Sequence, residues 1–149
     1  MEIETTQFGI IHIEEENIIT MPQGMPGFPG CDRFVIFERE ETWPFYWYQC
    51  VDEPELAFVI IDPFLFKPDY SVNTKLVMEE MLWQDDEKDS IKIYTIVNAS
   101  NSRPKDITVN LLGPIVINTK RNQAIQWVIH NKPYSHKYPL FFPKKTKNQ

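Results

Sequence analysis

Residues 33–61 read RFVIFEREETWPFYWYQCVDEPELAFVII. This stretch holds three runs of β-branched and aromatic residues, at 33–38, 45–50 and 56–61, each closed by a cluster of Pro, Asp or Glu. Residues of these types suit a pleated, half-buried surface. The stretch therefore predicts three consecutive short strands.

The same pattern extends along the rest of the chain. Comparable runs lie at 8–13, 17–21, 91–97, 107–112, 115–117 and 124–129. The first two of these predict a hairpin around the acidic turn 14–16. Nine short strands at intervals of about 8–12 residues favour a barrel or a sandwich. We expect a mainly β fold, namely a small barrel-like sheet with antiparallel or mixed pairing.

One segment departs from the strand pattern. Residues 71–83, SVNTKLVMEEMLW, are rich in straight-chain helix formers and lack Gly and Pro. This composition predicts one helix of about three turns, which Ser71 or Asp69 could cap at its start.

The length of 149 residues fits one domain, which we place at 1–142, followed by a basic tail at 143–149 that we expect to fray. Residues 1–89 carry 20 acids and 5 bases, for a net charge of −15, whereas the remainder carries a net +9. Such asymmetry can mark an electrostatic partner. A β fold that interleaves the two halves would dilute the contrast in space, so both outcomes stay open.

The chain shows no secretory signal and no apolar run near the ~20 residues that span a bilayer, so we expect a cytoplasmic protein without membrane contact. In that compartment, Cys31 and Cys50 are expected to be reduced, partly buried thiols. The scattered basic residues and the net charge of −6 argue against direct binding of nucleic acid.

Candidate catalytic and metal-binding residues are few. The three histidines, His12, His130 and His136, lie far apart in the sequence and predict no metal site and no cofactor. Four acids, Asp62, Asp69, Glu79 and Glu80, could pair across a cleft as acid and base. Asp62 and Asp69 could also surround an end pocket together with His12. This leaves a small-ligand-binding or hydrolytic barrel as the alternative function.

Two aromatic clusters, at 43–48 and 64–66, carry more bulk than one face of a strand can bury. Aromatic side chains in a rigid, acid-rimmed loop are typical of interface anchors. They could equally close one end of a barrel core, and both interpretations remain open.

Several motifs in a fixed order resemble the family of the flagellar assembly factor FliW. They are Phe8-Gly9, the loop GMPGF at 24–28, Pro44-Phe45 followed by Gln49, the tripeptide at 57–59, Asp62-Pro63, Asp69-Tyr70, NLLGPIVIN at 110–118 and Pro133-Tyr134. The resemblance covers residues 5 to 142. Its structural-motif residues are Gly24, Pro26, Gly27, Phe28, Asn110, Pro114 and Asn118.

The resemblance implies a barrel-like β fold and a cytoplasmic protein without enzymatic activity. It also implies two alternative partners, namely the RNA-binding translational repressor CsrA and flagellin. Binding of CsrA would relieve repression of flagellin synthesis, and flagellin, which the protein binds as a chaperone, would recapture it.

The composition of 62–89 suggests where CsrA would bind. A repressor that holds RNA is basic, so an acidic surface would steer the two proteins together. We expect the contact to be rimmed by Asp62, Asp69, Glu79, Glu80, Asp85 and Asp86. We expect it to be anchored by Phe64, Leu65, Phe66 and Tyr70.

Overall fold

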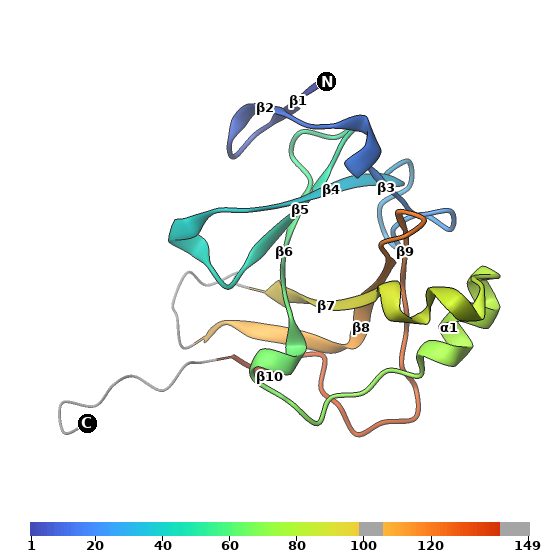
Figure 1. The fold of residues 1–149 in the computed structure, drawn as a ribbon. Coiled ribbons are helices and arrows are strands. Elements are labelled where there is room, and N and C mark those ends of the chain that lie inside the picture. Colours follow the sequence, from blue (N-terminus) through green and yellow to red (C-terminus); the bar gives the residue numbers. More distant parts are fainter. Residues whose placement is uncertain (99–105, 141–149) are drawn as a thin grey trace.

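Seven strands close into a barrel in the computed structural model, which describes residues 1–98 and 106–140 (Figure 1). They are β3 (Ile19–Thr20), β4 (Arg33–Glu38), β5 (Tyr46–Cys50), β6 (Ala57–Ile61), β7 (Ile91–Asn98), β8 (Thr108–Asn118) and β9 (Gln123–Gln126). The order around the barrel is β8-β7-β6-β5-β4-β3-β9, and β9 pairs with β8 to close it. Among the described strands, only β3 and β9 run parallel, through Thr20 and Gln123. The expected mainly β, mixed barrel is confirmed.

The other elements surround this barrel. The remaining strands are β1 (Glu2–Thr5) and β2 (Gly9–His12), which form a separate ribbon, and β10 (Tyr138–Pro139), which pairs with β8. The helix is α1 (Thr74–Met81), and the 3-10 turns are η1 (Glu15–Asn17), η2 (Glu40–Thr42), η3 (Pro63–Leu65) and η4 (Asp85–Ser90). The tail 143–149 lies outside the described residues.

The predicted hairpin of 8–13 with 17–21 is wrong. Strand β2 pairs with β1 instead, from Glu2 opposite His12 to Thr5 opposite Gly9. The turn between them is held by Thr5, whose hydroxyl donates to the Gly9 carbonyl at 2.7 Å and accepts the Phe8 amide at 2.9 Å. Of the acidic residues that were expected to form a turn, Glu15 and Glu16 lie in η1 and Glu14 precedes it.

The runs 107–112 and 115–117, expected as two strands, belong to the single strand β8, and the described residues hold ten strands rather than nine. The register of β8 against β7 shifts between Tyr94, opposite Ile115, and Ile96, opposite Asn110. Asn110 accepts the Leu112 amide at 2.9 Å within this irregular stretch. Beyond it, Asn118 is fully buried and accepts the amides of the next turn at 3.0 and 3.2 Å.

The helix is shorter than expected and is capped differently. It begins after Asn73, whose side chain accepts the Leu76 amide at 3.2 Å, so neither Ser71 nor Asp69 is the cap. It ends at Leu82, which is left-handed with φ of 59°, while the Trp83 amide donates back to the Met78 carbonyl at 2.9 Å. This is a Schellman-type ending, which satisfies carbonyls of the last turn.

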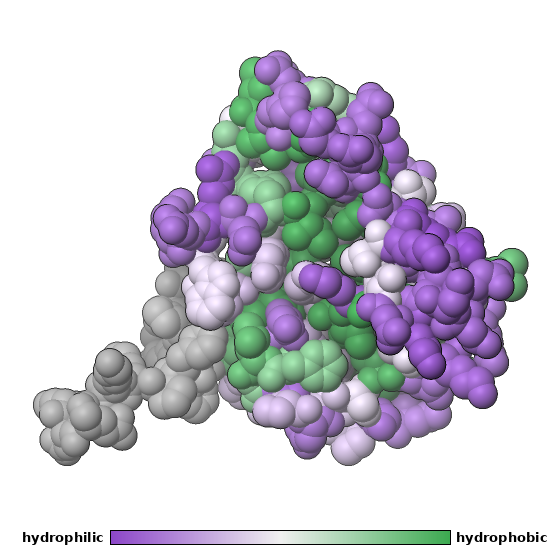
Figure 2. Space-filling model, in the orientation of Figure 1, coloured by the Kyte–Doolittle hydropathy of each residue, from purple (hydrophilic) through white to green (hydrophobic). Residues whose placement is uncertain are grey.

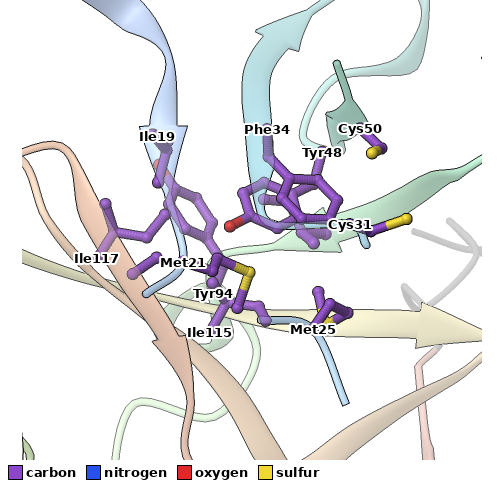
Figure 3. Packing of buried hydrophobic residues seen from close by; sticks show 12 residues of the cluster. Ile19, Met21, Met25, Cys31, Phe34, Tyr48, Cys50, Tyr94, Ile115 and Ile117 are labelled. Atoms are coloured by element: carbon purple, nitrogen blue, oxygen red, sulfur yellow. The ribbon is translucent and has the colours of Figure 1, made fainter. Parts of the chain in front are cut away.

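The barrel interior is filled by large apolar side chains. Phe34 and Tyr48, both fully buried, stack with ring centroids 4.3 Å apart (Figure 3). The loop 22–30 contributes Met25 to this cluster, and Gly24 and Gly27 adopt φ of 74° and 88° to turn the chain there. The loop is therefore an irregular turn, for which glycine and proline are suited because glycine permits positive φ and proline fixes φ.

The barrel keeps the two oppositely charged halves of the chain apart. Strands β3 to β6 come from the acidic half and are neighbours, whereas β7 to β9 come from the basic half (Figure 1). The exceptions are α1 and η4, which come from the acidic half. The helix packs through Val77 and Met78 onto Val116 of β8 and Ile125 of β9, and η4 bonds through Glu87 to Arg121. The acidic helix thus lies against the basic half of the barrel.

Candidate partner-binding surface

The residues expected to contact a partner fall into two groups in the structure. The η3 group comprises Asp62, Phe64, Leu65, Phe66, Asp69 and Tyr70. The helix group comprises Glu79 and Glu80 of α1 and Asp85 and Asp86 of η4. Figure 1 places η3 near β10 and α1 at the side of the barrel, so the two groups do not form one continuous cluster.

The η3 group presents two apolar side chains to solvent. Asp62 caps η3 by accepting the Phe64 amide at 2.9 Å. Phe64 is 41% exposed and Leu65 is 52% exposed. A cavity of about 280 Å³ lies between Asp62, Phe64 and the first residues of β7. This turn therefore offers apolar contact area beside a carboxylate.

The other two expected anchors belong to the core. The Tyr70 side chain is buried, and its hydroxyl donates to the Leu111 carbonyl at 2.7 Å. Phe66 stacks on Tyr138 with centroids 5.8 Å apart. Asp69 is exposed, with the ammonium of Lys67 3.3 Å away. Each open interpretation of the aromatic loop thus holds for part of it, since Phe64 and Leu65 face solvent while Tyr70 closes the core.

The helix group is a solvent-facing set of four carboxylates. All four residues are exposed, and Figure 2 shows hydrophilic residues gathered over α1 and η4. A cavity of about 380 Å³ between the two elements is lined by Glu79 and Asp85 and also by Lys75 and Lys88. The local field is therefore mixed, with the acids of the helix group interspersed with two lysines.

A fifth acid in this region, Glu87, has a structural role that the sequence did not reveal. It is buried and accepts Arg121 Nε on both carboxylate oxygens, at 2.8 and 2.9 Å, and the Gln84 amide at 2.7 Å. The Arg121 hydrogen bonds, followed by that of Gln84, hold the pKa of Glu87 below its usual value. This contact ties η4 to the turn between β8 and β9. In sequence, Glu87 is one of several acids in a run, so no signal distinguished it.

Replacing Glu87 with glutamine should destabilise the protein at neutral pH, and the loss should shrink in acid. Because the folded-state pKa of Glu87 is lowered, its ionised form stabilises the fold above the unfolded-state pKa of about 4.3. That contribution is lost as pH falls through the folded-state pKa. Urea denaturation of E87Q and the parent from pH 7 to pH 3 measures this contribution to the free energy of unfolding. The variant D86N, which changes an exposed acid, serves as the control. A gap between E87Q and the parent that does not change with pH would contradict this prediction.

The acid–base alternative receives no geometric support. His12 and Asp62 line two different cavities, and Asp69 is beside Lys67. Among residues 1–98 and 106–140, no three His, Cys, Asp or Glu side chains gather as a metal site. Cys31 and Cys50 are buried free thiols, and burial raises the pKa of Cys31 to about 11.

Comparison with known proteins identifies the family. A family model described as FliW protein matches residues 2–140. The flagellar assembly factor FliW of Caldanaerobacter subterraneus subsp. tengcongensis is 38% identical over 141 residues, covering 94% of this chain and 93% of the relative. That of Geobacter sulfurreducens is 41% identical over 141 residues, covering 95% and 87%. A crystal structure of the flagellar assembly factor FliW has a TM-score of 0.84 and 33% identity, covering 97% of this chain and 99% of that chain.

The closed seven-stranded barrel with a helix on its side defines the chain as a small mixed β-barrel protein. It belongs to the FliW family of flagellar assembly factors. The motifs at 24–28 and 110–118 that carry the resemblance are a turn and a strand of the fold. Across the part of the chain that the structure describes, no helix is long and apolar enough to cross a membrane.

Proposed function

We propose that this chain is a non-enzymatic, cytoplasmic regulator that binds CsrA and thereby relieves repression of flagellin synthesis. Flagellin is the second partner, which the chain binds as a chaperone and which displaces CsrA. Membership in the FliW family is the observation that carries the proposal. The exposed acids of the helix group support it, because an RNA-binding repressor carries positive charge.

In this proposal, the helix group steers the encounter and the η3 turn contributes apolar contact. Exposed charges mainly raise the association rate, whereas buried contacts slow dissociation. Glu79 and Glu80 are adjacent and exposed on α1, where the charge can act on an approaching protein. Phe64 and Leu65 offer apolar area that a partner can bury.

Charge reversal at two positions tests the steering. The double variant E79K/E80K should associate with purified CsrA about tenfold more slowly at low salt. The difference should shrink as salt rises, because screening removes the field of exposed charges. Association rates measured by stopped-flow or surface plasmon resonance over a series of salt concentrations test this expectation.

A matched control is E15K/E16K, which changes the net charge by the same amount. These two residues lie in the exposed η1 turn, which belongs to neither the helix group nor the η3 group. The control variant should slow association by no more than about twofold. Equal slowing in both variants would show that only net charge matters, and no slowing in either would place the contact elsewhere. Thermal melts of both variants establish that each remains folded.

The exchange between partners needs its own measurement. Preformed complex of this chain with labelled CsrA should release CsrA when purified flagellin is added. Failure of flagellin to bind, or binding that leaves CsrA attached, would contradict the exchange. Neither outcome bears on the binding of CsrA itself, which the association rates test.

A further inference from the structure

A second surface, lined by none of the residues of the helix group or the η3 group, is a groove between the start of α1 and the segment that follows β9. In Figure 1 this segment runs from β9 past the beginning of α1. The groove has a volume of about 230 Å³. It is lined by Ser71, Asn73, Leu76, Trp127, Val128, Ile129, His130, Asn131 and Lys132. Leu76 is 49% exposed and Val128 is 54% exposed, so its walls offer apolar area to solvent.

The wall formed by 127–130 is an extended edge with unused backbone groups. The amides of Trp127 and Ile129 donate to the carbonyls of Pro114 and Leu112 of β8, at 2.9 and 2.8 Å. In an extended chain, alternate amides point to opposite edges. The amides of Val128 and His130 therefore point away from β8, and within the described residues neither donates to a backbone or side-chain acceptor.

The charge of the groove is opposite to that of the chain. Although the chain carries 21 acids, no carboxylate lines this groove. Its fixed charge is the ammonium of Lys132, which is held by the Ser71 hydroxyl at 3.0 Å and has further donors free. The Ser71 amide in turn donates to the Tyr134 hydroxyl at 3.0 Å, which anchors this end of the groove.

We propose that this groove binds an extended peptide segment of a protein partner, in which apolar residues alternate with carboxylates. The segment adds as a strand to the Val128–His130 edge, so its backbone accepts the two free amides. Its apolar side chains cover Leu76 and Val128, and a carboxylate pairs with Lys132. This site goes beyond the proposed function and does not depend on it.

A designed peptide tests the site without any natural partner. The probe is a capped heptapeptide of alternating glutamate and valine, titrated into the full ¹⁵N-labelled chain. We expect the amide resonances of Val128 and His130 to shift with saturation. A peptide with lysine in place of glutamate should bind at least fivefold more weakly. Binding that leaves both resonances unmoved, as a helical occupant or adsorption elsewhere would give, overturns the proposal.

Backbone pairing and charge are tested separately. Methylating the peptide nitrogens of either the valines or the glutamates blocks one strand edge, so one of these two peptides should lose binding and the other should keep it. Equal affinities of the two would overturn strand addition. On the protein, K132E should weaken binding at least fivefold, while K137E, an equal charge change outside the groove, should not. Equal effects of the two would overturn the pairing with Lys132.

Discussion

Replacing Gln49 with glutamate should lower the free energy of unfolding at pH 7 by about 4 kcal/mol. Gln49 is fully buried at the end of β5, and its amide Nε2 lies 3.0–3.3 Å from four carbonyl oxygens, those of Cys50, Glu53, Pro54 and Leu56. A carboxylate at this position has no proton to donate, so its negative charge would lie against four carbonyl oxygens that are also hydrogen-bond acceptors. The substituted side chain must therefore take up a proton on folding, which from an unfolded pKa of about 4.3 to pH 7 costs about 1.36 kcal/mol per pH unit.

The deficit of Q49E, like that of E87Q, should shrink in acid, but for a different reason, because here the titrating carboxyl group belongs to the variant and not to the parent. A carboxyl group whose folded-state pKa is raised stabilises the fold least at high pH, so the deficit of Q49E should shrink as pH falls toward about 4.3. Urea denaturation at pH 7 and pH 4.5 measures the change. Q126E makes the same substitution at a half-buried glutamine that donates only to the Gly113 carbonyl, and should cost about 1–2 kcal/mol. Similar losses in the two variants would contradict the role given to the four carbonyls.

The second large effect is expected from F34A, at about 3–5 kcal/mol of unfolding free energy. Phe34 is fully buried in the barrel interior and stacks on Tyr48, so its removal leaves a cavity that the surrounding strands cannot fill by collapsing. Equilibrium urea denaturation of the purified variant at neutral pH gives this value.

F28A serves as the comparison for F34A. Phe28 lies in the loop 22–30, is partly exposed and touches Phe58 edge-on with centroids 5.4 Å apart. Its removal should cost no more than about 1 kcal/mol, because solvent already reaches the side chain. Losses of equal size at the two positions would mean that the barrel interior is not the main source of stability.

The strands of this fold were predictable because alternation and β-branched residues are local signals. The run 33–38 corresponds to β4, and 91–97 lies within β7. Pairing partners were not predictable from such signals. The run 8–13 could pair with the segment before it or the segment after it. It pairs with β1, and the hydrogen bonds of the Thr5 hydroxyl stabilise the turn between the two strands.

The partner-binding residues show the same limit. Composition could identify 62–89 as acidic and aromatic, but not which side chains fold inward. Tyr70 is buried because its hydroxyl reaches the Leu111 carbonyl, 41 residues later in the chain, and Glu87 is buried because Arg121 satisfies it. Both contacts join segments that are distant in sequence, so no local pattern encodes them.

The parallel bridge between Thr20 and Gln123 has a consequence for the synthesis of this protein. Strand β3 can complete its place in the barrel only after β9, which lies far later in the chain, has left the ribosome. Pairings between such distant residues form slowly, because the ends of a long loop must first meet. During translation, the early strands β4, β5 and β6 therefore form an open sheet with exposed edges until the barrel closes. At this stage the nascent chain is most exposed to aggregation.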